Sequence, residues 1–160
     1  MNIFFDLEWR RDGKIFLLGW ARNTRHYGFL YGKKLTKTNI VETFAGSSFV
    51  FVWGPDCGKI ENAFDFPFRD YFRCVNLLSV VRDHVKAKDY KLTTIERKFK
   101  IPRLVNLKDQ REDIYSLWIE QPQTVLEYTL QDVLSLYVIE QTLRDKYGLT
   151  AYDFRQHELQ

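Results

Sequence analysis

The chain has 160 residues with a formal net charge of +3, the size of a single domain, which we expect over residues 1–150 with a polar tail at 151–160. Apolar residues make up 45% and charged residues 28%, a globular composition that excludes a disordered chain. Fully apolar runs such as residues 49–53 are far shorter than the ~18 residues of a membrane span, and the N-terminus lacks the basic region of a signal peptide.

The first part of the chain predicts strand pairing. Apolar runs predict strands over residues 2–8, 15–21, 27–34 and 47–54. The turn-forming residues 10–14 make the first two strands an antiparallel hairpin. Helices are expected over residues 36–45 and from Pro55 to Pro67.

The rest of the chain predicts mainly helix. Residues 72–81 are strand-like at first and then ambiguous. Apolar residues at helical spacing predict helices over residues 92–99 and 124–147, the second of which ends at Gly148. The order of elements predicts an α/β fold, a mixed sheet flanked by helices.

Asp6 and Glu8 stand two residues apart at the end of the first predicted strand. Because side chains alternate between the faces of a strand, both carboxylates point to one side and Leu7 points to the other. Two like charges on one face destabilise each other unless a cation lies between them, and Mg²⁺ prefers carboxylate oxygens. The alternative is a solvated strand end with two ordinary surface acids.

Two more acids stand in apolar surroundings. Asp56 follows the most apolar strand, at the carboxyl end where open α/β sheets hold ligands, although an acid after proline is also a common helix cap. Asp132 lies in an apolar helix, one turn after Tyr128 and on the same face. A metal or charged partner would remove the cost of burying this carboxylate, and a position on the polar edge of the helix is the alternative.

The order of these acids is similar to that of a known enzyme family. Residues 5–8 (FDLE), residues 53–56 (WGPD) and the pair Tyr128 and Asp132 resemble the motifs of the DEDD 3′–5′ exonucleases. These enzymes form the DnaQ-like branch of the ribonuclease H-like fold, and the resemblance covers roughly residues 2–147 of this sequence. A tyrosine four residues before the last aspartate marks the DEDDy subgroup.

The second motif of that family has two candidates here. The family pattern often reads N-x-x-F-D, and residues 62–65 (NAFD) are a shortened version of it. Asp65 is therefore a rival to Asp56. Asp56 is preferred because it directly follows the apolar strand, whereas Asp65 lies near the far end of the short helix.

The resemblance implies a two-metal-ion hydrolysis that releases nucleoside 5′-monophosphates from a 3′ end. The implied ligands of the two divalent ions, Mg²⁺ or Mn²⁺, are Asp6, Glu8, Asp56 and Asp132. Tyr128 would orient the attacking water, because a phenol with a pKa of ~10 is a poor base at neutral pH. The expected nucleotide contacts are Leu7, Trp9 and Phe64, with core packing as the alternative for the two aromatic residues.

Single-stranded DNA or RNA with a free 3′ end is the implied partner, and no membrane is expected. Residues 82–103 carry eight Lys or Arg and three acids, a net charge of +5, which suits either a phosphate backbone or a solvated face. Cys57 and Cys74 lack metal spacing, which favours packing roles and a reducing, cytoplasmic setting. DNA versus RNA, oligomeric state and association with replication, repair or RNA-processing proteins stay open.

Two alternatives of other classes use the same fold. One is a nucleic-acid-binding or partner-binding module that has lost turnover, against which the full set of costly acids argues. The other is an endonuclease or junction nuclease, which the Tyr-x-x-x-Asp element disfavours.

Overall fold

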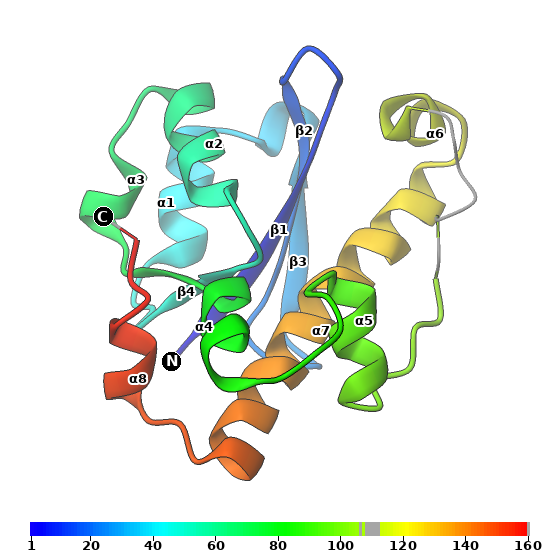
Figure 1. The fold of residues 1–160 in the computed structure, drawn as a ribbon. Coiled ribbons are helices and arrows are strands. Elements are labelled where there is room, and N and C mark those ends of the chain that lie inside the picture. The colour runs from blue at the N-terminus through cyan, green and yellow to red at the C-terminus, as the bar shows by residue number, and fades with distance from the viewer. Residues whose placement is uncertain (106, 108–112, 160) are drawn as a thin grey trace.

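A five-stranded mixed sheet lies at the centre of the computed structural model, which describes residues 1–105, 107 and 113–159 (Figure 1). Its strand order is β3-β2-β1-β4-β5. β1, β2 and β3 pair antiparallel, and β4 and β5 run parallel to β1. The strands are β1 (Ile3–Trp9), β2 (Ile15–Ala21), β3 (Tyr27–Tyr31), β4 (Val50–Val52) and β5 (Cys74–Asn76).

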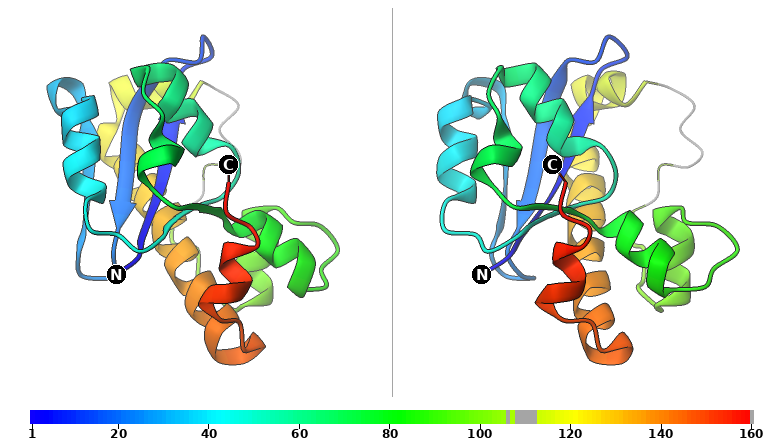
Figure 2. Two further views of the ribbon diagram at one scale, coloured as in Figure 1. Left: turned by 90° about the vertical axis from the view of Figure 1, so that its left-hand side faces the viewer. Right: turned by 60° about the vertical axis from the view of Figure 1, so that its left-hand side comes forward.

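Helices cover both faces of this sheet, which confirms the expected architecture (Figures 1 and 2). One face packs on α1 (Lys37–Phe44), α2 (Asp56–Phe64) and α3 (Phe68–Tyr71), with the short 3₁₀ helix η1 (Gly32–Lys34) before them. The long helix α7 (Pro122–Tyr147) crosses the other face. The remaining helices are α4 (Leu77–His84), α5 (Leu92–Lys98), α6 (Ile114–Glu120) and α8 (Ala151–Arg155).

The side chains of β1 alternate between two apolar layers. Phe5 packs on Phe44 and Phe68, with ring centroids 5.1 and 6.0 Å away. Phe4 points to the opposite face, where it stacks on Phe51 at 5.2 Å and contacts Tyr137 of α7 at 5.6 Å. The same alternation places the next even-numbered residues of β1, both acids, on the face that α7 covers.

The close approach of α7 to the hairpin depends on Gly19. This residue lies opposite Asp6 in the β1–β2 register, and a Cβ atom added to it would stand 2.7 Å from Cγ2 of Thr129. The missing side chain leaves room for Thr129, whose hydroxyl then reaches Glu8 at 3.2 Å. Glycine at this position therefore brings α7 within reach of the acids of β1.

The ambiguous segment 72–81 divides into a strand and a helix at Asn76. β5 ends at this residue, and its side-chain oxygen accepts a hydrogen bond from the Leu78 N–H at 3.1 Å, which caps α4. α6 lies in a segment for which the sequence pattern predicts no element.

The polar tail at 151–160 contains a short helix that packs on the domain. α8 begins with a capping box between Thr150 and Asp153, and Phe154 is fully buried against Phe51. The Leu159 N–H also donates to the Cys74 carbonyl at 2.7 Å. The polar composition of this segment did not indicate that Phe154 would be buried. Residue 160 lies outside the described residues. None of the described helices has the length and apolar character that a bilayer span requires.

Candidate metal centre

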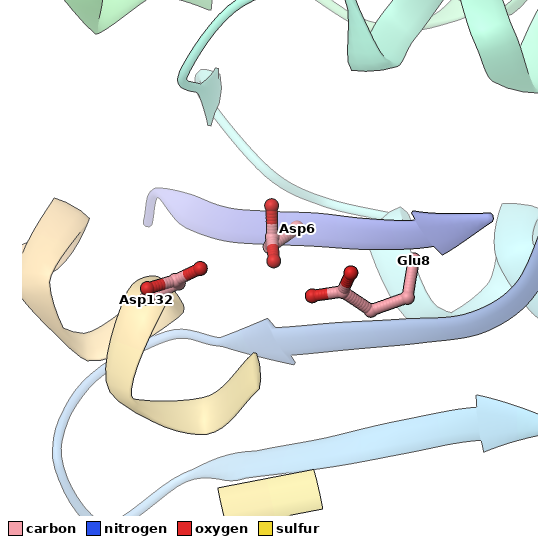
Figure 3. A group of neighbouring side chains, drawn as sticks. All are labelled: Asp6, Glu8 and Asp132. Carbon is pink, nitrogen blue, oxygen red and sulfur yellow. The ribbon is translucent and has the colours of Figure 1, made fainter. Parts of the chain in front are cut away.

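Three carboxylates from distant parts of the sequence converge on one face of the sheet. Asp6 and Glu8 project from β1, and Asp132 projects toward them from α7 beside the strand (Figure 3). One oxygen atom of each lies within 4.8 Å of the corresponding atoms of the other two. The strand alternation and the helix position expected from the sequence thus bring these side chains together.

Asp56 lies next to this group. β4 is short, and its pairing with β1 extends over two residue pairs, Ile3 with Val50 and Phe4 with Phe51. Farther along β1, the Leu7 N–H donates a hydrogen bond to Asp56 Oδ2 at 3.0 Å. The carboxylate thus accepts from a backbone N–H that lies beyond the pairing with β4. Asp56 is only 3% exposed. Its carboxylate is therefore held against the backbone between Asp6 and Glu8.

The turn at Gly54 places Asp56 there. Gly54 has a φ of +104°, a region that other residues rarely adopt, and its N–H donates to the Asn76 side chain at 3.0 Å. Pro55 follows, and Asp56 becomes the first residue of α2, where the helix dipole favours a negative charge.

Asp65 lies at the opposite end of α2. It is exposed, forms the C-terminal cap and has a φ of +49°. At ~1.5 Å per residue, the nine-residue spacing along the helix separates it from Asp56 by about 13–14 Å. Of the two rival acids, Asp56 therefore lies beside Asp6 and Glu8, and Asp65 lies at the far end of α2.

Burial raises the pKa of every carboxyl group in this site. The pKa of Asp6 lies well above its usual range, through burial and then through the charges of Glu8, Asp132 and Asp56. Burial and the charge of Asp132 raise the pKa of Glu8 to about 8. Burial raises the pKa of Asp56 to about 7 and that of Asp132 to about 6, with the Arg103 charge opposing the second shift. The four groups resist ionising together unless a cation replaces their protons.

Tyr128 stands one helical turn before Asp132 on α7. Burial and the Asp132 charge raise the pKa of its phenol above the ordinary value. The guanidinium of Arg103 lies over its ring at 5.7 Å. The hydroxyl therefore stays protonated at neutral pH and is available as a hydrogen-bond donor.

The three expected nucleotide contacts lie in different environments. Leu7 is 3% exposed and packs in the core. Trp9 is half-buried, with the Lys59 ammonium 4.1 Å above its ring. Phe64 is half-buried and lines a cleft of about 680 Å³ together with Trp118.

Sequence reasoning did not identify three residues around the acids. Thr129 donates to Glu8, as described above, and Arg103 forms an ion pair with Asp132 at 2.5 Å. Glu96 is 1% exposed on α5 and binds Arg103 in turn. No comparable sequence signal marks Glu96, because Arg97 and Lys98 follow it, whereas apolar residues surround Asp132.

The donor set fits a hard divalent cation. The oxygens of Asp6, Glu8 and Asp132 are close together and are of the kind that Mg²⁺ and Mn²⁺ take as ligands. Glu8 and Asp56 are buried, and Asp6 and Asp132 are half-buried. The raised pKa values have the same origin, since negative charge is concentrated where water is scarce.

Residues 3–144 match the model of a protein family described as the RNase_H superfamily. The chain belongs to the RNase H superfamily. No curated protein sequence matches it.

Solved structures agree with this RNase H superfamily membership. The family B DNA polymerase of Pyrobaculum calidifontis aligns with a TM-score of 0.70 and 14% identity over 89% of this chain, which spans only 24% of the polymerase. Brucella melitensis NrnC aligns with a TM-score of 0.67 and 16% sequence identity, and the alignment covers 98% of this chain and 79% of NrnC. Exonuclease X in complex with 5′ overhanging duplex DNA aligns with a TM-score of 0.57 and 9% sequence identity, and the alignment covers 98% of both chains. The mixed sheet with its flanking helices is thus the RNase H-like fold that DnaQ-like exonucleases share.

Proposed function

We propose that this protein is a metal-dependent 3′–5′ exonuclease of the DEDDy type, which removes nucleoside 5′-monophosphates from single-stranded nucleic acid. The convergence of the Asp6, Glu8 and Asp132 carboxylates, with Asp56 beside them, carries the proposal. Its likeness to Exonuclease X, whose structure holds duplex DNA, supports nucleic acid as the substrate class.

The four carboxylates are the proposed ligands of two divalent cations, Mg²⁺ or Mn²⁺. Such cations would supply charge neutralisation at the phosphate and lower the pKa of bound water. Asp6 and Glu8 hold their positions on a paired strand, and Asp56 is fixed by the Leu7 N–H. Tyr128 keeps its proton and orients the attacking water by a hydrogen bond rather than accepting a proton from it.

Aromatic and basic side chains near the site suit a single strand. Trp9 directly follows Glu8, and Lys59 lies above its ring, one helical turn after Asp56. Phe64 lines the cleft farther along α2, and stacking on such rings contributes ~1–3 kcal/mol per base. We propose Trp9 and Phe64 as base contacts. The Leu7 side chain is 3% exposed and packs in the core on the face opposite Asp6 and Glu8, so the expected nucleotide contact at this residue is not proposed.

The basic segment 82–103 adds seven exposed cations. Arg103 differs, because it is partly buried in an ion pair. The exposed ones attract a phosphate backbone in a salt-dependent manner. They are Arg82, Lys86, Lys88, Lys91, Arg97, Lys98 and Lys100.

Oligonucleotides labelled at one end test the proposed activity. DNA and RNA single strands carrying a 5′ label are incubated with the protein and Mg²⁺ or Mn²⁺. We expect a ladder of products shortened one nucleotide at a time, with immediate release of the label from 3′-labelled strands. Binding without cleavage would indicate a module without turnover, and internal cuts would indicate an endonuclease. Either result would contradict the proposal.

Substitution of Tyr128 with phenylalanine tests the water-orienting role. We expect turnover to fall by about 10- to 100-fold, because one positioned hydrogen bond is lost. Mn²⁺ affinity should change little, since the phenol is not a proposed ligand. Tyr137→Phe, on the same helix but packed on Phe4, is the matched control and should retain the wild-type rate. An unchanged rate in Tyr128→Phe would show that another group orients the water.

A further inference from the structure

Arg103 joins two carboxylates that lie on different helices. Its Nε and Nη2 atoms donate to Glu96 of α5 at 2.8 and 2.9 Å. Nη2 also donates to Oδ1 of Asp132 on α7 at 2.5 Å, and Nη1 donates to the Val105 carbonyl at 3.2 Å. The Arg103 side chain is only 11% exposed. Its guanidinium is therefore almost fully used by partners inside the protein.

Glu96 anchors this arginine. Its carboxylate is buried and also accepts a hydrogen bond from the Ser135 hydroxyl at 2.5 Å. Gln131 donates to Ser135 at 3.1 Å and to the Pro102 carbonyl at 3.3 Å, and its oxygen accepts from the Leu104 N–H at 3.2 Å. The backbone on both sides of Arg103 is thus fastened to α7.

These contacts prevent Arg103 from moving away when Asp132 acquires a metal ion. A guanidinium that left Glu96 would leave a buried charge without its partner, which is strongly unfavourable. One oxygen of Asp132 therefore remains with Arg103, and the other is left for a cation. The positive charge also stays in contact with one of the proposed metal ligands.

We infer that Arg103 is a positioning residue and a fixed countercharge, which weakens cation binding while it orders Asp132 and Tyr128. This inference rests on the proposed function. Arg103 fixes the Asp132 side chain through Oδ1 and lies 5.7 Å over the ring of Tyr128, so one group restrains both functional residues of α7. Glu96, which touches neither a substrate nor the proposed ions, acts through Arg103.

Two opposing effects decide the result of removing Arg103. The freed Asp132 carboxylate loses its fixed orientation, which weakens cation binding slightly. The site also loses the positive charge that contacts the Asp132 carboxylate and would repel a cation bound there, and at an effective dielectric constant of ~20 this term is the larger. Cation binding is therefore expected to tighten while turnover falls. A residue with a purely structural role would not produce this opposite pair of changes.

The double variant Glu96→Gln/Arg103→Gln tests the inference without leaving either partner alone. Mn²⁺ affinity is measured by electron paramagnetic resonance, and turnover is measured on a 5′-labelled single strand. We expect Mn²⁺ to bind about tenfold more tightly or better, and turnover to fall about 100-fold. Glu140→Gln/Arg144→Gln is the matched control, an arginine with a buried glutamate on the same helix, and should change neither quantity.

Arg103→Lys separates the charge from the geometry. Lysine retains the positive charge but cannot bind Glu96 and Asp132 with a planar fork. We expect Mn²⁺ affinity within about threefold of wild type and turnover reduced at least about tenfold. If circular dichroism shows that the double variant does not fold, this single variant decides, and wild-type turnover in it would overturn the inference.

The outcomes distinguish the inference from the function on which it rests. Wild-type protein that binds Mn²⁺, together with a folded double variant of equal or weaker affinity, overturns the role of Arg103 alone. Wild-type protein that binds no Mn²⁺ overturns the metal centre itself.

Discussion

Replacement of Asp6 with asparagine is expected to abolish metal-dependent cleavage while the protein stays folded. Asp6 lies at the centre of the carboxylate group, where the charges of Glu8, Asp132 and Asp56 all act on it. Asparagine has the same shape but lacks the negative charge that binds a dication. The loss should be on the order of 10³-fold or more, because a bound metal supplies several kcal/mol of transition-state stabilisation.

The matched control for this variant is Asp65→Asn. Asp65 is the rival acid of the second motif, and it is exposed at the far end of α2. We expect it to retain wild-type activity, whereas Asp56→Asn should be as inactive as Asp6→Asn. Rates are measured on 5′-labelled strands at saturating Mg²⁺. Full activity in Asp6→Asn, or loss of activity in Asp65→Asn alone, would contradict the site as described.

The metal-free protein is expected to lose thermal stability as the pH rises from about 4.5 to about 8. Folding raises the pKa of Glu8 from 4.5 to about 8 and that of Asp56 from 3.8 to about 7. Between these values the native state retains protons that the unfolded chain has released. The free energy of unfolding therefore falls with rising pH, and it is highest below the unfolded pKa values.

This dependence is measured as the melting temperature in EDTA across that pH range. A fall of about 5–10 °C is expected, and saturating Mn²⁺ should reverse it at pH 8. Glu8→Gln removes one of the raised pKa values and should flatten the slope. Glu42→Gln, which alters an exposed acid on α1, should leave the slope unchanged. Stability that rose with pH in the metal-free protein would show that these carboxylates are not buried together.

Local patterns in the sequence predicted much of the fold and the members of the acid group. The alternation of β1 follows from its period of two, so Asp6 and Glu8 had to share a face. The long apolar helix set the position of Asp132 relative to Tyr128 through the same kind of periodicity. Asp56 was predictable from the turn after an apolar strand. Each of these inferences needs only the geometry of one element and its termini.

The interactions that fix these acids depend on contacts between distant elements. Thr129 reaches Glu8 because Gly19 has no side chain, a fact that involves three separate segments. Arg103 meets Asp132 across 29 residues, and nothing in the local pattern around it indicates a partner. The boundary between β5 and α4 was ambiguous because Asn76, the N-cap of α4, stands inside an apolar run. Tertiary packing, rather than local preference, decides such points.

The geometry also suggests how one site can hold four acids in a stable fold. The Leu7 N–H and the Thr129 hydroxyl each contact one carboxylate, and Arg103 neutralises a third. These contacts lower the cost of concentrated negative charge without removing it. The remaining charge is what a divalent cation would neutralise. Binding of the cation and stability of the site are therefore linked.

An anomalous difference map from a crystal soaked in Mn²⁺ tests the metal centre most directly. The account predicts a peak bonded to carboxylate oxygens of Asp6 and Asp132, with Glu8 and Asp56 as the other nearby ligands. Arg103 should still contact Asp132 in that crystal. No peak between β1 and α7 at saturating Mn²⁺, or a peak elsewhere with these four side chains empty, would contradict it.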